Sequence, residues 1–422
     1  MSTLTISLVS EHASPLATLG GVDAGGQNVH VAALARALAE RGHTVTVHTR
    51  RDSAALPEHV PLCPGVTVHH VAAGAPEPLP KDALLPHMGA FGDQLARYWA
   101  HHRPDVVHAH FWMSGVAALR GARLHGVPVL QTYHALGTVK RRHQADADTS
   151  PPTRIAIEAA LGRSVATVIA TCRDEVAELR AMGVPEDRIE VVPCGVDPRR
   201  FSPHGPRAPR TDRPRLLAVG RLVARKGVHL AVDALPRLPG VELLVAGGPP
   251  VDRLDEEPEA RRLRARAAEL GVADRLVLLG GVSSARMPAL LRSADLVLCP
   301  ARYEPFGIVP LEAMACGVPV VATAVGGHLD TVVHHRTGLL VRPDSTDALT
   351  AAVVTMLADP ATRAAYGTAG RRRVEHRFAW QSVAESTEQV YREVLAQPVW
   401  ATRRGRRAGA APTPARTTTG AS

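Results

Sequence analysis

Two successive runs of alternating strand and helix signals constrain the fold of this chain most strongly. The first run has short strand-like segments at residues 5–10, 44–49, 105–110, 127–134, 166–172 and 189–197. The second run has such segments at residues 215–222, 241–248, 275–281, 294–300 and 318–323. Strands that alternate with helices form parallel sheets with right-handed crossovers. We therefore predict an α/β protein with two Rossmann-like, doubly wound parallel-sheet domains.

A stretch rich in Pro and Arg at residues 201–213 has no periodicity and predicts an interdomain linker. It separates an N-terminal domain at residues 1–200 from a C-terminal domain at residues 214–380. Residues 398–422 are rich in Ala, Thr, Gly and Pro and predict a disordered basic tail. Ligands of open α/β sheets bind at the carboxyl ends of the strands, so the cleft between the domains is the expected site.

The net charge of +9 is concentrated in this tail, where five arginines without an acid supply +5 and leave +4 on the folded body. We interpret the tail as an unconstrained end and predict no nucleic-acid partner. Polar residues interrupt every apolar run, so no stable membrane insertion is expected. The five cysteines lack CxxC spacing, and the first residues lack the basic region of a signal peptide. A reducing cytoplasm is the expected location.

Two glutamates, Glu304 and Glu312, are separated by seven residues in the segment EPFGIVPLE. Pro310 suits the first turn of a helix, and Gly317 suits the position that follows its last turn. Glu304 is therefore expected in the preceding loop and Glu312 inside the helix. Such a pair can accept hydrogen bonds from hydroxyl groups of a sugar or ribose, although two glutamates in isolation are usually surface charges.

A basic site lies upstream of these glutamates. Arg221 follows the strand at 215–222, and Lys226 lies in the loop before the next helix. Two cations near a helix N-terminus favour a diphosphate, since arginine can fork two phosphate oxygens and lysine supplies a movable charge. Alone this would be an ordinary charged loop; together with the glutamate pair it indicates a binding site.

The glutamate segment and the pattern G-R-L-x-x-x-K-G at residues 220–227 resemble motifs of retaining glycosyltransferases of the GT-B fold, family 4. The resemblance covers roughly residues 4–395. It is greatest to sucrose-phosphate synthase and to the inositol-phosphate N-acetylglucosaminyltransferase of the mycothiol pathway. It implies two Rossmann-like domains that face each other across a cleft, with a C-terminal helix at 381–397 that packs back on the first domain.

The resemblance also implies roles on the donor side. Arg221 and Lys226 would hold the nucleotide diphosphate and stabilise it as it leaves. Glu312 would bind the ribose hydroxyls, and Glu304 would bind hydroxyls of the donor sugar. Glycine permits close backbone approach. Backbone amides that can reach the sugar and phosphates are those of Phe306, Gly307 and Ile308.

The loop GGVDAGGQN resembles the corresponding glycine-rich loops of the two relatives. A turn of this kind between strand and helix lets backbone N–H groups meet the donor diphosphate. We predict Gly25 and Gly26 in that role, with Gln27 and Asn28 near the acceptor. The loop does not follow G-x-G-x-x-G, so nicotinamide binding is poorly supported.

On the acceptor side, His134 ends the strand at 127–134. A histidine there is by default structural, but it matches the family's active-site histidine, which contacts the donor sugar. We therefore group His134 with Arg221, Lys226 and Glu304 as catalytic residues. Three further cations match phosphate-binding residues of the relatives and would suit an acceptor phosphate. These cations are Lys81, Lys140 and Arg154.

The chain departs from the inositol-phosphate enzyme at two positions. Phe111 and Ala135 stand where that enzyme has tyrosine and threonine. Two acceptor hydroxyl contacts are therefore missing, which argues against inositol phosphate as the acceptor.

Two metal-like patterns carry little weight. Asp146 and Asp148 form a D-x-D pattern in a polar loop, whereas a metal motif should end a strand beside the nucleotide. His108 and His110 share one strand face but lack a third ligand at suitable spacing. We predict no metal and no cofactor, because the nucleotide sugar acts as a co-substrate.

The resulting hypothesis is a retaining, metal-independent transferase that moves a hexosyl group from a nucleotide-diphosphate sugar to a small sugar or polyol, phosphorylated or not. The family mechanism is front-face transfer, in which the departing diphosphate accepts the acceptor proton. Two alternatives stay open: a nucleotide-sugar 2-epimerase and a non-catalytic sugar-nucleotide-binding protein. Acceptor-dependent release of nucleotide diphosphate separates the three. The sequence leaves the base, the sugar, the acceptor and the oligomeric state undetermined.

Overall fold

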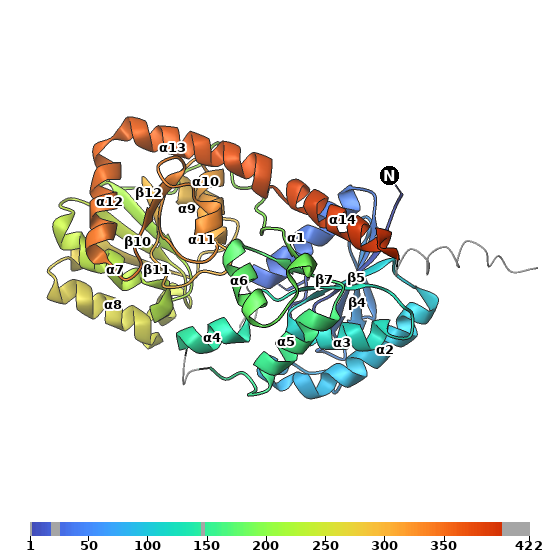
Figure 1. Ribbon diagram of the computed structural model, residues 1–422. Coiled ribbons are helices and arrows are strands. Elements are labelled where there is room, and N and C mark those ends of the chain that lie inside the picture. The colour runs from blue at the N-terminus through green and yellow to red at the C-terminus, as the bar shows by residue number, and fades with distance from the viewer. Residues whose placement is uncertain (1, 18–25, 145–147, 399–422) are drawn as a thin grey trace, which may run out of the picture.

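The structure is a computed structural model that describes residues 2–17, 26–144 and 148–398 (Figure 1). It consists of two α/β units, each built around one sheet. This arrangement confirms the predicted fold class. Gly25, Asp146 and the basic tail from residue 399 onward lie outside the described residues. Within the described residues, no helix combines the length and apolar character needed to cross a membrane.

The first unit contains an eight-stranded sheet of order β3-β4-β2-β1-β5-β6-β7-β8. Neighbouring strands run parallel, except that β3 pairs antiparallel with β4. Its strands are β1 (Thr5–Val9), β2 (Thr44–Arg50), β3 (His59–Cys63), β4 (Val66–Val71), β5 (Val106–His110), β6 (Val129–Thr132), β7 (Thr167–Ala170) and β8 (Ile189–Val191). Its helices are α1 (Gly26–Glu40), η1 (Lys81–Ala83), η2 (Leu85–His87), α2 (Met88–His101), α3 (Trp112–Ala122), α4 (Gly137–Gln144), α5 (Arg154–Ser164), α6 (Arg173–Ala181) and η4 (Glu186–Arg188).

The second unit contains a six-stranded parallel sheet of order β11-β10-β9-β12-β13-β14. Its strands are β9 (Arg215–Val219), β10 (Glu242–Ala246), β11 (Leu276–Gly280), β12 (Leu296–Cys299), β13 (Val320–Thr323) and β14 (Gly338–Val341). Its α-helices are α7 (Val228–Ala234), α8 (Pro258–Glu269), α9 (Met287–Arg292), α10 (Ile308–Ala315), α11 (His328–Thr331), α12 (Thr346–Ala358) and α13 (Pro360–Arg373). Short helical turns are η5 (Ala224–Lys226), η6 (Leu235–Arg237), η7 (Val251–Glu256) and η8 (Ala273–Arg275).

Several inner strands of both sheets are buried along their whole length, which is expected where helices cover both faces of a parallel sheet. Every residue of β5, β6 and β7 in the first unit is buried, and so is every residue of β12 and β13 in the second. β12 is a continuous apolar run, whereas β5 and β6 also bury polar side chains, among them His108, His110 and Gln131. The loops that follow their carboxyl ends carry the candidate site.

The chain crosses back to the first unit through the π-helical segment η9 (Val374–Phe378) and the helix α14 (Trp380–Ala396) (Figure 1). Tyr391 and Val394 of α14 share a buried cluster with Leu34 and Leu38 of α1. The chain first passes from the first unit to the second after β8, in the segment that begins near Val196. This first crossing lies beside the second, because the amide of Val196 donates to the carbonyl of Phe378 at 2.8 Å. This pair of adjacent crossings is suited to act as a hinge between the units.

Candidate functional site

A cavity of about 750 Å³ opens between the two units. Asn28 of α1, Glu312 and Ile308 of α10, and Trp380 of α14 are among the residues that line it. The start of α1 faces the start of α10, since a Cβ placed on Gly26 would lie 3.4 Å from Cδ1 of Ile308. The cavity is therefore formed jointly by both units.

The two glutamates occupy different environments in the second unit. Glu304 lies in the loop between β12 and α10, and its carboxylate forms an ion pair with the ammonium of Lys226. Burial alone would raise the pKa of Glu304, but the charge and hydrogen bond of Lys226 together with the charges of His328 and Arg225 outweigh it, and the pKa is lowered. Glu312 lies inside α10, and burial raises its pKa to about 7, against the opposing charge of Arg200. Glu304 is thus held ionised, whereas Glu312 titrates near neutrality.

The cations beside Glu304 are arranged unequally. Lys226 ends the short turn η5 and points its ammonium at Glu304, and both side chains are largely buried. Arg225 is half-buried, and its pKa is lowered by burial and by the nearby charge of Arg221. Arg221 itself is exposed at the end of β9. Lys226 therefore contacts Glu304 directly, whereas Arg221 lies at the protein surface.

The loop that carries Glu304 packs tightly on the loop after β13. The amide of Gly327 donates to the carbonyl of Glu304 at 2.7 Å. A Cβ on Gly327 would lie 2.6 Å from the carbonyl carbon of Phe306, and Gly307 has a φ of 70° at the start of α10. Close backbone contacts of this kind fix the positions of the amides of Phe306, Gly307 and Ile308.

Gly227 provides a direct test of this packing. It has a φ of 68°, and a Cβ there would lie 1.9 Å from the carbonyl oxygen of Pro300, in the chain segment that leads to Glu304. Gly227→Ala is expected to lower the free energy of unfolding by about 1–3 kcal/mol more than Gly240→Ala. Gly240 has a φ of 72°, but a Cβ placed on it would have no atom within 4 Å, so it isolates backbone strain. Chemical denaturation measures both, and equal losses would contradict the packing argument.

His134 lies just after β6 in the left-handed region, with a φ of 62°. Its Nε2 lies 2.9 Å from Nδ1 of His110, and its ring meets the edge of Phe306 at 5.7 Å between centroids. Burial and neighbouring histidines, His30 first among them, hold its pKa well below the usual value, so the imidazole is neutral. Within the described residues Nδ1 of His134 has no hydrogen-bond partner although it is buried. An orphaned buried nitrogen beside the cleft is suited to contact a ligand.

Two residues that were not predicted complete the surroundings of His134. The ring of His30, from α1, lies 5.0 Å from that of His134 and 5.2 Å from that of Trp380, from α14. These three residues come from segments that are far apart in the sequence. Only their aromatic character could have marked them, because no spacing rule connects them.

The amide side chains of Gln27 and Asn28, predicted near the acceptor, form hydrogen bonds with other residues of the first unit. Nε2 of Gln27 donates to the carbonyl of His110 at 3.1 Å and to Oγ of Ser10 at 3.2 Å. Nδ2 of Asn28 donates to the carbonyl of Ser14 at 3.0 Å. Both residues therefore help to fix the start of α1 against the loop after β1.

The cations predicted on the acceptor side come together. Nζ of Lys140 lies 2.9 Å from both Oγ of Ser150 and Oδ1 of Asp148. Nη1 of Arg154 donates to the same Ser150 hydroxyl at 3.1 Å, and its Nε donates to Glu158 at 2.7 Å. Arg154 is only 2% exposed. Both cations thus already have carboxylate partners.

Phe111 connects Lys81 to this group. Nζ of Lys81 lies 5.3 Å from the centre of the Phe111 ring, and the guanidinium carbon of Arg154 lies 5.2 Å from it. Arg154 also donates to the carbonyl of Ala135, the residue after His134. The cluster of Lys81, Lys140 and Arg154 therefore adjoins His134. It also contacts Phe111 and Ala135, the two positions at which the chain departs from the inositol-phosphate enzyme.

The metal-like patterns have other partners. Asp148 pairs with Lys140, and although burial alone would raise its pKa, that contact and Ser150 lower it to about 2. Both ring nitrogens of His108 are hydrogen-bonded, to Tyr391 at 2.8 Å and to Thr132 at 2.9 Å. In the described part of the chain, one group has three potential metal ligands close together, at the β3–β4 edge. Its members are Glu58, His59 and His69.

The fold has two sheet-based units with a shared cleft. Together with Glu304 and Glu312, and with Arg221 and Lys226 after β9, this arrangement is that of a GT-B glycosyltransferase. Residues 24–200 match the model described as Glycosyltransferase Family 4, and residues 204–373 match Glycosyl transferases group 1. The chain belongs to this glycosyltransferase family, as its motifs indicated.

Known relatives match nearly the whole chain. A D-inositol 3-phosphate glycosyltransferase of Acidothermus cellulolyticus is 40% identical over 414 residues, which cover 93% of this chain and 91% of the relative. The solved sucrose-phosphate synthase from Thermosynechococcus elongatus has a TM-score of 0.82 at 33% identity and covers 93% of this chain and 99% of its own. Anabaena HepE, solved with UDP and glucose, has a TM-score of 0.69 at 19% identity over 92% of this chain and 99% of its own, and shares the fold.

Proposed function

We propose that this glycosyltransferase moves a hexosyl group from a nucleoside-diphosphate sugar to a small phosphorylated sugar or polyol, with retention of anomeric configuration. The observation that carries the acceptor assignment is the cluster of Lys81, Lys140 and Arg154 beside His134. Cations that converge on one hydroxyl and one ring suit a phosphate group. The names of the inositol-phosphate and sucrose-phosphate relatives point to the same chemistry.

Inositol phosphate is not the acceptor that we propose. Phe111 presents a ring, without a phenol hydroxyl, between Lys81 and Arg154. Ala135 contributes only its backbone carbonyl to Arg154. An acceptor whose phosphate is bound here would therefore find two fewer hydroxyl partners than in the inositol-phosphate enzyme.

The donor would bind by an exchange of partners. In the ligand-free structure Lys226 and Glu304 neutralise each other. A bound donor would place its diphosphate at Lys226 and Arg221 and a sugar hydroxyl at Glu304, so that each charged group gains a new partner. Glu312 would accept hydrogen bonds from the ribose hydroxyls.

In the proposed step the acceptor hydroxyl attacks the anomeric carbon on the face from which the diphosphate leaves. The glycosidic bond to the acceptor oxygen forms as the bond to the phosphate oxygen breaks, and the acceptor proton passes to the departing diphosphate. The cations Lys226 and Arg221 stabilise the charge that develops there, and closure of the two units aligns the reactants. The neutral ring of His134 would contact the donor sugar without accepting a proton.

The pKa of Glu312 gives this donor site a predicted pH dependence. If only the carboxylate binds ribose hydroxyls, a pKa of about 7 leaves about one tenth of the groups competent at pH 6 and about nine tenths at pH 8. The affinity for a nucleoside diphosphate should therefore rise about tenfold across this range. Calorimetric titration at several pH values measures it, with Glu312→Gln as the control, which should lack this rise and keep only the change caused by titration of the diphosphate itself. A rise in affinity toward low pH would contradict the assignment.

Product stereochemistry tests the retaining assignment. With an α-linked nucleotide sugar as donor, we expect an α-linked product by the anomeric proton coupling in NMR spectra. We also expect the initial rate to be unchanged by EDTA, because the two cations supply the charge at the diphosphate. A β-linked product would exclude the front-face step, and loss of turnover in EDTA that added Mg²⁺ restores would exclude metal independence.

A further inference from the structure

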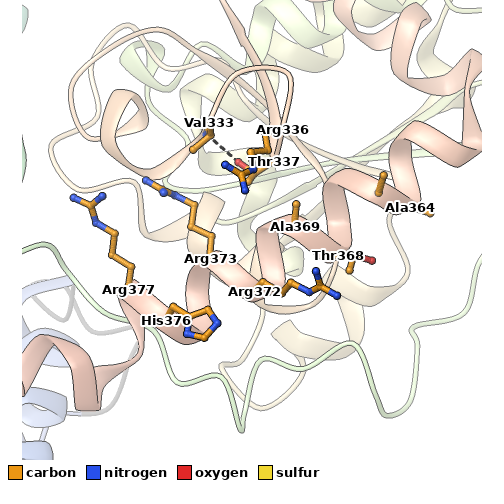
Figure 2. A pocket seen from close by; sticks show the side chains of 11 residues that line it. Val333, Arg336, Thr337, Ala364, Thr368, Ala369, Arg372, Arg373, His376 and Arg377 are labelled. Atoms are coloured by element: carbon orange, nitrogen blue, oxygen red, sulfur yellow. Dashed lines mark hydrogen bonds between the residues drawn. The ribbon is translucent and has the colours of Figure 1, made fainter.

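A second cavity of about 750 Å³ lies on the second unit at the end of α13. Figure 2 shows its basic lining, with one arginine from the loop after α11 and the others from the end of α13 and from η9. Among the described residues, none that lines this cavity is acidic. The basic side chains of the lining are Arg336, Arg372, Arg373, His376 and Arg377.

Several of these charges are not compensated by the protein. Arg336, Arg372 and Arg377 are exposed, and their guanidinium groups form no hydrogen bond or ion pair with residues of the described part of the chain. Arg377 packs against the Phe378 ring at 5.7 Å, a contact that leaves its N–H groups unused. The cavity therefore has donors available for a ligand.

Acids near the cavity are committed to other cations. Asp330 accepts from Nε of Arg173 at 2.6 Å, and Glu375 accepts from Nε of Arg371 at 2.7 Å. The pKa of Arg373 is lowered by burial and then by neighbouring arginines, although Asp330 acts in the opposite direction. The field in the cavity is therefore positive.

Arg373 is rigidly placed at the base of this group. Its Nε donates to the carbonyl of Thr331 at 3.0 Å and its Nη2 donates to that of Asp330 at 2.7 Å. Both carbonyls belong to the end of α11, so the guanidinium is positioned before any ligand arrives. Two of its five N–H groups are used in this way, and the others can contact an anion.

We propose that this cavity is a second phosphate-binding site, which takes a phosphorylated small molecule and is separate from the donor and acceptor sites. Planar guanidinium groups match the oxygens of phosphate, and the volume suits a small ligand. The cavity adjoins the hinge, because η9 leads directly into the crossing at Phe378. A ligand held between Arg336 and Arg377 would link the second unit to that crossing.

Pyrophosphate binding tests the proposal in a background that weakens the other two phosphate sites. In Lys226→Ala/Lys140→Ala protein, isothermal titration calorimetry with inorganic pyrophosphate at low salt should still show one site per chain. Adding Arg336→Ala and Arg372→Ala should weaken that site at least tenfold. The matched control adds Arg97→Ala and Arg123→Ala, which remove two exposed arginines of the first unit and should leave the affinity unchanged.

Three outcomes would overturn the proposal. One is no binding in the Lys226→Ala/Lys140→Ala background. Another is an equal loss in the control, which would show only a general effect of net charge. The third separates the sources of phosphate: binding to phosphatidylglycerol vesicles that depends on Arg336 and Arg372, without pyrophosphate binding, would assign the cavity to a lipid headgroup instead. Thermal unfolding confirms that each variant is folded.

Discussion

Lys226→Ala is expected to lower kcat by about 100- to 1000-fold, because in the proposed step its charge stabilises the departing diphosphate. The ammonium is largely buried and forms an ion pair with Glu304, which the proposal assigns to the donor sugar. In the variant Glu304 also loses the one cation with which it forms an ion pair among the described residues, so its pKa should rise. Steady-state measurement of nucleoside diphosphate release gives kcat and KM separately.

A nearby cation serves as the control. Arg302 lies in the same loop as Glu304 but is exposed and pairs with Asp344 at 2.6 Å. Arg302→Ala should change kcat by less than about threefold, as surface ion pairs contribute little. If Lys226→Ala fell in the same range, the diphosphate would not depend on Lys226 and the proposed step would be wrong.

Lys226→Arg should also be impaired. Lys81, Lys140 and Lys226 are the only lysines of a chain with 49 Lys and Arg residues, and all three are candidate site residues. Lysine supplies a compact, movable charge that the broader guanidinium does not reproduce. In such an arginine-rich chain, a retained lysine is itself a sequence signal for a site.

Arg154→Ala is expected to lower the free energy of unfolding by about 3–5 kcal/mol, because it leaves the buried carboxylate of Glu158 without its partner. Arg154 is 2% exposed and also donates to Ser150 and to the Ala135 carbonyl. Burial already raises the pKa of Glu158 against the opposing effect of Arg154. Denaturant unfolding measures the loss.

A double variant separates the effect of Arg154 on stability from its effect on acceptor binding. Arg154→Met/Glu158→Gln removes both charges and should recover much of the stability. Acceptor KM should stay raised in this variant if Arg154 also binds the acceptor phosphate. Arg120→Ala, at an exposed pair with Asp93, should leave the melting temperature nearly unchanged. Stability losses as small in Arg154→Ala as in Arg120→Ala would contradict the buried pairing.

Much of the fold could be predicted from the sequence, because short strand-like segments rich in apolar residues alternate with helical segments between turn signals. Strands β3, β4 and β14 were not predicted. β3 contains Pro61 and β4 contains His69 and His70, which weaken an apolar pattern, while β14 begins at Gly338 and lies at the edge of its sheet. Strands at or next to a sheet edge depend on pairing with a neighbour more than on their own composition.

The candidate site was predictable as a set of residues but not as a set of contacts. Pro310 and Gly317 place Glu312 within a helix and Glu304 before it, which local rules capture. The pairing of Lys226 with Glu304 joins residues 78 positions apart, and it depends on how two loops fold together. The contact of Asp148 with Lys140 of α4 is likewise one that no local rule predicts.

Acceptor-dependent release of nucleoside diphosphate tests the central claim most directly. Wild-type protein and Lys140→Ala would be incubated with a panel of nucleotide sugars, alone and with matched phosphorylated and unphosphorylated sugars and polyols. We predict release only when a phosphorylated acceptor is present, and a raised acceptor KM in Lys140→Ala. Equal release with the unphosphorylated partners, or conversion of the donor without any acceptor, would contradict transfer to a phosphorylated acceptor.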